Sequence, residues 1–499
     1  MRVAALLLMT VLFLGSPVAS LQAAIPRSNL AQLQEKHRQH HAQFMANLEK
    51  LATDCEQKGL TEAAVTVRES IRPIDDVDHH RKTLPKDVQP EIPVSLPEQE
   101  RFWRMQLRHL RNNYAQELYL LSRRVLYLGL PSYAYQLVRE TAVHDPDHTQ
   151  ARKILGFVRY GTEWVTPFAA KMLREHNVWS DQYGWLPKSS LDRYLAGERM
   201  CNGRWMSATQ EGEIRRDFRQ AWEIRTDHYL VKTNYDLERG VELASSLEQF
   251  YTTFHEIFAG FFNTPEQMQR LFESSAGAPG KLQRPYIVHF YRTKDEYVSR
   301  LQRQFPQIGS TNGFYQTDER IVHFFYDPAI NNEATLFHEA THQLFFESHL
   351  GRRQIAENAY FWIVEGIACY MESFQHDGQG VSLGDSTYIR FVGAHHNAIN
   401  EKYYVPLREF SSMGSREFQT VPLPALAKNY TQAAGLAWFL MDADKGRYRQ
   451  SLIEQLMDLY SANAHTRANA RGLDELTGED YEELDRQYLE FLATQKLQR

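Results

Sequence analysis

Two histidines four residues apart constrain the fold of this chain more than any other feature. His338 and His342 lie in the run FHEATHQL, whose apolar spacing is that of a helix. A spacing of four places both imidazole rings on one face of this helix, with Glu339 between them in sequence. We expect the helix to start after Asn332, a candidate N-cap, and to stop at Gly351.

The pattern His-Glu-x-x-His is typical of a hydrolytic zinc site. Two neutral histidines one helical turn apart can share one zinc ion, and Glu339 then lies beside the open position where water would bind. The third ligand that we predict is Glu365 in the run WIVEGIACYME, separated from His342 by 22 residues. This interval suffices for a turn and a returning apolar helix that holds the carboxylate toward the metal.

Other acceptors near the motif fit less well. His349 follows His342 by seven residues, whereas the His-rich metzincin pattern needs six and a glycine where this chain has Phe345. Glu347 and Glu357 are nearer than Glu365, but no rigid apolar helix is expected around them. The predicted ligands of one Zn²⁺ ion are therefore His338, His342 and Glu365.

The two motif helices resemble those of the gluzincins, zinc metallopeptidases of the peptidase MA-like superfamily. They resemble more closely an uncharacterised group of secreted bacterial proteins within that superfamily. HEATHQL and WIVEGIACYME carry the resemblance, which extends over roughly residues 222–492. It implies that His338, His342 and Glu365 bind zinc and that Glu339 is the general base. The interval of 22 residues is slightly longer than in the best-known gluzincins, so the loop between the helices is expected to differ.

The resemblance also implies a reaction, the hydrolysis of a peptide bond by metal-activated water with Glu339 as the base. Such enzymes tend to place a Tyr or His donor where the tetrahedral oxyanion develops. Our candidate is Tyr430, because NYTQAAGLAW resembles the tyrosine-containing helix downstream of the site in related proteins. Tyr370, His395 and His396 are alternatives, and a role of Tyr430 in packing alone stays open.

The substrate that we expect is a polypeptide. An apolar strand over residues 321–326 precedes the motif helix and would form the edge of the cleft, where an extended peptide could add as another strand. Glu372 follows Glu365 on the same expected helix. It could orient a ligand histidine, with a solvated surface charge as the alternative.

Two functions of other classes compete with the peptidase. A catalytically inactive zinc-binding or peptide-binding protein could keep the gluzincin fold, but it would have no use for Glu339 between the histidines. A structural zinc site usually has four ligands, mostly cysteines, and Cys369 is the lone cysteine near the motif. Retention of Glu339 therefore favours the enzyme.

The N-terminus has the order of a secretory signal peptide. Arg2 precedes an apolar run over residues 3–14, and small residues follow. This run is shorter than the roughly 20 residues that cross a bilayer. We expect cleavage after Ser20 or Ala23, a secreted or periplasmic protein, and no stable membrane insertion after cleavage.

Composition excludes some other classes. The chain has 499 residues, of which 43% are hydrophobic, so it can bury two or three cores. Its net charge of -6 gives no basic surplus for neutralising phosphates, and nucleic acid is not an expected partner. Three cysteines are too few for a disulfide scaffold, although Cys55 and Cys201 could pair outside the cytoplasm.

The fold class that we predict is α+β. Helical hairpins come first, and a zincin-like domain follows with a small, mostly antiparallel sheet and a helical C-terminal lobe. The predicted segments are a signal peptide (1–23), a helical arm with a Pro-rich linker (24–97), helical hairpins with two Gly-x-Trp segments (98–221) and the zincin-like domain (222–499).

The N-terminal half offers fewer functional signals. A hairpin over residues 134–155 resembles one degenerate tetratricopeptide repeat, and one copy cannot form a solenoid. The helical region would present the domain to a protein partner or occlude its cleft. Segments 161–166 and 203–207 each place a tryptophan after a glycine. We expect these tryptophans to fill small hydrophobic cores rather than to bind a ligand. The first helical segment also carries three histidines, which we interpret as part of a solvated helix face: His37, His40 and His41.

Overall fold

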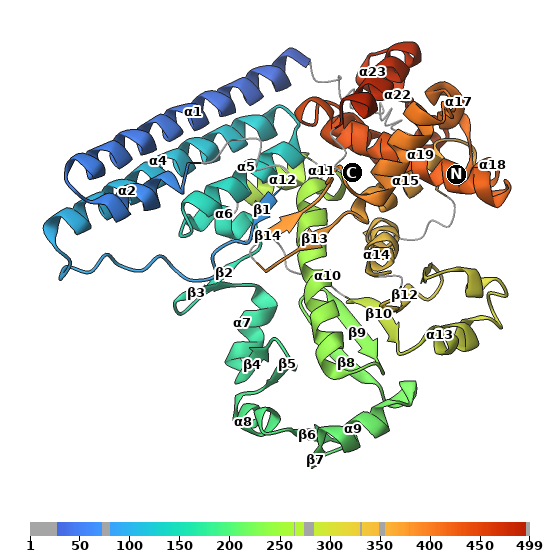
Figure 1. Cartoon of the computed structure of the whole chain (residues 1–499), viewed down its shortest axis with the longest axis horizontal. Helices are drawn as coiled ribbons and strands as arrows, with labels where there is room; N and C mark the ends of the chain where they lie inside the picture. The colour runs from blue at the N-terminus through green and yellow to red at the C-terminus, as the bar shows by residue number, and fades with distance from the viewer. Residues whose placement is uncertain are drawn as a thin grey trace, which may run out of the picture.

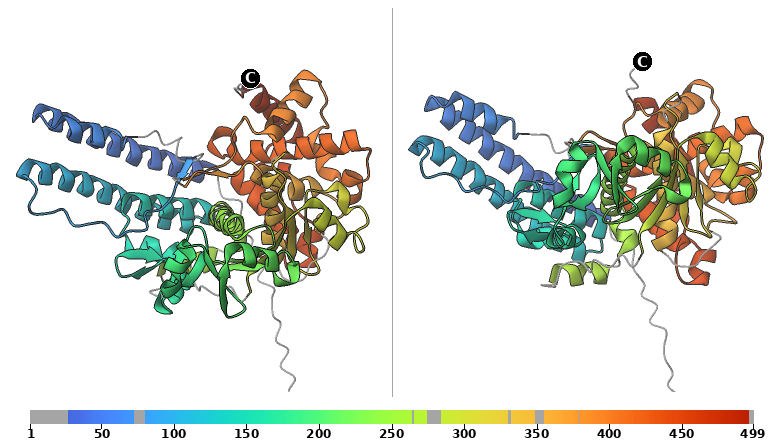
Figure 2. Two further views of the ribbon diagram at one scale, coloured as in Figure 1. Left: turned by 60° about the horizontal axis from the view of Figure 1, so that its bottom comes forward. Right: turned by 90° about the horizontal axis from the view of Figure 1, so that it is seen from below.

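The computed structural model describes residues 27–71, 80–263, 265–273, 284–329, 332–348, 355–378 and 380–495. The fold is α+β, as predicted. Long N-terminal helices project as an arm from one side, and the C-terminal helices form a lobe on the other (Figures 1 and 2). Within these ranges, none of the helices combines the length and apolar character that a membrane span needs. The predicted signal peptide and Gly351 lie outside the described residues.

A five-stranded mixed sheet supports the C-terminal half, in the order β11-β12-β10-β9-β8. The outer pairs are antiparallel hairpins, whereas β10 runs parallel to both of its neighbours. Both parallel pairings need crossovers, which the helices after β9 and β10 supply. The strands are β8 (Trp222–Arg225), β9 (Tyr229–Thr233), β10 (Tyr286–Tyr291), β11 (Gly313–Gln316) and β12 (Ile321–Phe325).

The edge of this sheet differs from our prediction. We expected the strand over residues 321–326 to border the cleft, but β12 pairs with β10 on one side and with β11 on the other. The prediction is wrong because the hairpin folds back on the outside of β12. The strand that ends the sheet on this side is therefore β11.

Alternating side chains give the sheet two different faces. Val288, Phe290, Val322 and Phe324 contribute to the main core, whereas Tyr291 and Phe325 point to a small cluster beneath α13 (Lys294–Leu301). The helices that share the main core with the sheet are α10 (Leu237–Ile257), α14 (Glu333–Ser348), α15 (Phe361–Met371) and α19 (Leu423–Asp442).

The C-terminal lobe continues this core with short helices. They are α16 (Ile389–His395), α17 (Leu407–Ser412), α18 (Ser415–Gln419), α20 (Arg449–Leu459), α21 (Ala464–Ala468), α22 (Leu473–Thr477) and α23 (Tyr481–Thr494). A separate three-stranded sheet joins the lobe to the linker before α4. Its strands are β1 (His80–Lys82), β14 (Gly380–Ser382) and β13 (Gln375–His376).

The arm has a core of its own, and helices from the second half pack against it. α12 (Pro265–Glu273) adds Met268 and Phe272 to that core, and in α11 (Ala259–Phe262) the amide of Gly260 donates to Ser132 Oγ at 3.0 Å. The arm is therefore packed against the sheet domain at its base. Its helices are α1 (Arg27–Gln57), α2 (Thr61–Arg68), α4 (Glu98–Tyr127), α5 (Pro131–His144) and α6 (Thr149–Ile154).

The histidines of α1 correct the interpretation of a solvated face. His37 and His41 are buried, because their spacing of four directs both toward α4 and α5. His37 Nε2 lies 3.0 Å from a Glu140 carboxylate oxygen, and the His41 ring contacts Tyr114 edge-on. His40 pairs with a surface glutamate. These histidines therefore stabilise the packing of the arm.

The Gly-x-Trp segments are β-hairpins, and a third copy lies between the two that we predicted. The middle copy escaped detection because Trp185 follows Gly184 directly. Trp164 in the first copy is buried and donates to Asp147 Oδ1 at 2.9 Å, which favours a structural role. Cys201 lies buried and unpaired in the last copy along the chain. The hairpins and their helices are β2 (Val158–Tyr160), β3 (Glu163–Val165), α7 (Pro167–Arg174), β4 (Asn177–Ser180), β5 (Gly184–Pro187), α8 (Leu191–Leu195), β6 (Glu198–Cys201), β7 (Arg204–Ser207) and α9 (Ala208–Arg215).

Candidate metal centre

Helices α14 and α15 bring the three predicted metal ligands together. His338 Nε2 and His342 Nε2 lie 3.1 Å apart, and Glu365 Oε2 lies 3.4 Å from the first and 3.6 Å from the second. Ligands bound about 2.0 to 2.1 Å from one tetrahedral ion lie roughly 3.3 Å from one another. The three side chains therefore fit a single zinc ion without rearrangement.

Local packing explains why Glu365 reaches this place. A Cβ atom on Gly366 would lie 2.6 Å from the carbonyl oxygen of Ala433, so only glycine lets α19 approach α15 this closely. At the start of α15, the amides of Tyr360 and Phe361 donate to the carbonyls of Ser411 and Met413. The helix that holds the carboxylate is thus fixed at its N-terminus and along one side.

The start of α14 is fixed in a way that the sequence did not indicate. We expected Asn332 to cap this helix. Instead its Oδ1 accepts from the amide of Asp327 at 2.8 Å, and its Nδ2 donates to the carbonyl of Phe325 at 2.9 Å. Asn332 therefore ties the end of β12 to the start of the motif helix.

A second carboxylate orients His338. His338 Nδ1 donates to Glu372 Oε1 at 2.8 Å, which leaves Nε2 for a metal. Tyr388 Oη and Arg390 Nε donate to the other oxygen of Glu372 at 2.7 and 3.0 Å. Glu372 is buried, so the alternative of a solvated surface charge is wrong. Tyr388 and Arg390 are absent from our predictions, because no motif connects them with the metal ligands.

The charges of the cluster favour a cation. Burial alone would raise the pKa values of Glu365 and Glu372, but their contacts with the histidines lower both, that of Glu372 to about 2 with help from Arg390. Burial alone would lower the pKa of His338, yet Cys369, Glu365 and Glu372 raise it well above its ordinary value. The ionised carboxylate of Glu365 thus faces both histidines and can stabilise a positive ion between them, whereas Glu372 contacts His338 on its Nδ1 side.

A second set of potential ligands shares His338. His338 Nδ1, Cys369 and Glu372 also lie close enough for one ion, with Cys369 Sγ at 4.0 Å from Nδ1. Here Arg390 donates to both oxygens of Glu372, so a cation already neutralises this carboxylate. The set with Glu365 has no such cation in contact with its carboxylate among the described residues, which makes it the better metal site.

Glu339 lies beside the edge of the sheet. Its Oε2 accepts from the amide of Tyr315 on β11 at 2.8 Å, and its side chain stays partly exposed. One strand therefore both fixes this carboxylate and ends the sheet next to it.

Among the four oxyanion candidates, Tyr430 interacts electrostatically with the predicted metal ligands. It lies on α19, and its hydroxyl interacts electrostatically with Glu365 and His338. Burial, first, and the charge of Glu365 raise its pKa, so the hydroxyl keeps its proton. The hydroxyl of Tyr370, in contrast, donates to Asp442, and His396 pairs with Glu401 at the surface.

Residues 332–458 match a family model described as a protein of unknown function, DUF1570. No curated protein matches the chain. The matched region starts at the first turn of α14 and ends in α20, so it includes the cluster and Tyr430. The candidate metal centre therefore lies within the part of the chain that the family model matches.

Proposed function

We propose that this protein is a zinc-dependent peptidase. The observation that supports this best is the arrangement of His338, His342 and Glu365 around one point, with the carboxylate of Glu339 on the same helix beside an open sheet edge. We also propose that the chain is exported, on the basis of its N-terminal sequence.

Each residue has a role in the proposed hydrolysis. Zinc, held by the three ligands, would act as a Lewis acid toward the scissile carbonyl and lower the pKa of water. Glu339 takes the proton of the attacking water and delivers it to the leaving amine. Tyr430 donates a hydrogen bond to the developing oxyanion. Glu372 holds the His338 ring in the tautomer that leaves Nε2 unprotonated.

The sheet edge suggests the kind of substrate. Backbone groups of β11 that pair neither with β12 nor with Glu339 are available to an extended chain, which would then pass Glu339. A polypeptide fits this edge better than a compact small molecule does.

Metal content and peptide cleavage test the proposal together. The purified mature chain should carry one zinc ion and cleave members of an unbiased peptide library, and a chelator should stop cleavage. Zinc without cleavage would support the alternative, a zinc-binding or peptide-binding protein that keeps the fold. A chain that takes up no zinc would contradict the ligand assignment.

Tyr430→Phe tests the oxyanion donor. Loss of its hydroxyl should lower kcat by roughly a hundredfold, because one preorganised donor to the oxyanion is removed. KM and zinc content should change little. The comparison is His395→Gln, which removes an alternative donor and should leave kcat unchanged. A normal rate for Tyr430→Phe would assign this tyrosine to packing against Phe418.

A further inference from the structure

A strand of the N-terminal linker borders a segment that reaches the metal centre. β1 pairs antiparallel with β14, and β14 begins a stretch of residues 380–390 that we call the returning segment. At the far end of this segment, Tyr388 and Arg390 donate to Glu372, the carboxylate that orients His338. The linker before α4 is therefore in contact with the support of the centre.

Gly380 allows the two strands to approach each other closely. A Cβ atom at this position would lie 2.6 Å from the carbonyl oxygen of Arg81 and 3.4 Å from the Cα atom of Lys82. A side chain on Gly380 would therefore push β1 away from β14. Because β14 lies between β1 and β13, loss of β1 would expose the backbone groups of β14 that face it.

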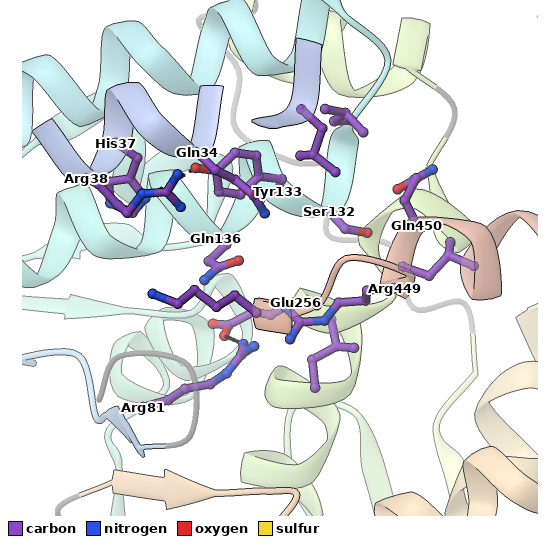
Figure 3. Close-up of a pocket in the computed structure, with 16 residues that line it drawn as sticks. Gln34, His37, Arg38, Arg81, Ser132, Tyr133, Gln136, Glu256, Arg449 and Gln450 are labelled. Carbon is purple, nitrogen blue, oxygen red and sulfur yellow. Dashed lines mark hydrogen bonds and ion pairs between the residues drawn. The ribbon is translucent and has the colours of Figure 1, made fainter. Parts of the chain in front are cut away.

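The side chain of Arg81 fixes β1 to a helix of the main core. Its Nη1 lies 2.9 Å from a carboxylate oxygen of Glu256 on α10, and Arg139 of α5 pairs with the other oxygen at 3.0 Å. Figure 3 shows the ion pair of Arg81 and Glu256 in a pocket that α1 and α20 also line. Arg81 also interacts electrostatically with the hydroxyl of Tyr370 on α15, the helix that carries Glu365. β1 is therefore held both by its backbone and by this side chain.

The returning segment reaches Glu372 after a second point of attachment. The amide of Gly384 donates to Ser373 Oγ at 2.9 Å, and Tyr388 and Arg390 then donate to one carboxylate oxygen of Glu372. The side chain of Arg390 is 34% exposed, so packing alone does not fix its guanidinium. The positions of both donors therefore depend on how firmly the backbone of the returning segment is held.

We propose that β1 is a positioning element of the metal centre. By pairing with β14, and with Arg81 bound to α10, β1 holds the backbone of the returning segment in place. The returning segment then keeps Tyr388 and Arg390 on Glu372. Through Glu372, the ring of His338 stays turned with Nε2 toward the metal site. This inference rests on the proposed zinc site and gives the linker before α4 a part in metal binding.

Gly380→Val separates the two strands and tests this role in the full mature chain. Zinc affinity, measured by competition with a chromogenic chelator, should fall roughly three- to tenfold, less than the roughly 10- to 100-fold that loss of a direct partner of a ligand costs. Exchange of backbone amides with deuterium should become faster over residues 380–390. Gly212→Val adds the same side chain on α9, where a Cβ atom meets no atom of the described residues within 4 Å, and should change neither quantity.

Glu372→Gln distinguishes positioning from a general loosening of the fold. This substitution removes the carboxylate through which β1 would act, so Gly380→Val should lower zinc affinity no further in a Glu372→Gln background. A further loss as large as that in the wild-type background would overturn the proposal, because β1 would then support the fold as a whole. Faster amide exchange with normal zinc affinity in Gly380→Val would also overturn it and leave β1 as an attachment of the arm alone.

Arg81→Met tests the same role without a steric clash. The variant loses the ion pair with Glu256 and should bind zinc more weakly, whereas Arg81→Lys keeps the charge and should recover most of the loss. These two variants decide if Gly380→Val does not fold, and normal zinc affinity in Arg81→Met would then refute the inference. A wild-type chain that binds no zinc would contradict the proposed site itself, and this inference with it, before any variant is compared.

Discussion

Glu339→Gln is expected to reduce peptide turnover by roughly 10³- to 10⁴-fold while zinc binding stays intact. The amide cannot accept the proton of the attacking water. Its oxygen can still accept from the amide of Tyr315, so the side chain should keep its place beside β11. Single-turnover cleavage of a fluorogenic peptide, with zinc measured on the same sample, checks both parts.

Glu347→Gln is the matched control for this variant. Glu347 lies on the same helix, is partly buried, and interacts with Gln343 and Tyr315. The substitution removes the same charge without contact to the predicted ligands, so the rate should stay close to that of the wild type. A rate for Glu339→Gln near that of Glu347→Gln would refute Glu339 as the base, whereas a loss of zinc in Glu339→Gln would point to a disturbed site.

The sequence predicted most elements that lie around the centre. Apolar patterns located the strand β12 and the helices α14 and α15. The order of the strands in the sheet could not be predicted from the sequence. Which strand ends the sheet depends on crossovers and on the side to which a hairpin folds, and neither leaves a local pattern.

In the site, too, residues within local sequence motifs were predicted, whereas residues that reach it through tertiary contacts were not. His338, His342 and Glu365 were found because two helices carry recognisable patterns, and the structure brings them within 3.6 Å of one another. Tyr388 and Arg390 escaped prediction, since their contact with Glu372 depends on how the chain folds back after α15. A regular interval between tryptophans could have revealed the third hairpin.

The histidines of α1 show how composition can mislead. The composition of this helix, rich in glutamine and histidine, suggests a solvated surface, but the helices α4 and α5 that face it offer polar groups of their own. His37 is buried against Glu140 and Tyr133 rather than exposed. Buried pairs of this kind need knowledge of the facing helix, which one sequence does not contain.

Glu365→Gln is expected to cause the largest loss of zinc affinity. The substitution takes one of three ligands and its negative charge from a cluster in which the side chain of Glu365 is only 9% exposed. The loss should exceed the roughly 10- to 100-fold that removal of an outer hydrogen-bond partner costs. Competition with a chromogenic chelator measures it, and peptide cleavage at limiting zinc should fall in parallel.

Variants of two further carboxylates allow the zinc affinities of three substitutions to be ranked. Glu372→Gln weakens the orientation of His338 and should lower zinc affinity roughly 10- to 100-fold, less than Glu365→Gln does. Glu347→Gln should leave zinc affinity unchanged. The opposite order for Glu365 and Glu372 would move the metal to the set of His338 Nδ1, Cys369 and Glu372. Cys369→Ser then decides, since a thiolate ligand is lost only in that arrangement. The ranking thus tests which nitrogen of His338 faces the metal. Glu339 can act on a metal-bound water only if this nitrogen is Nε2.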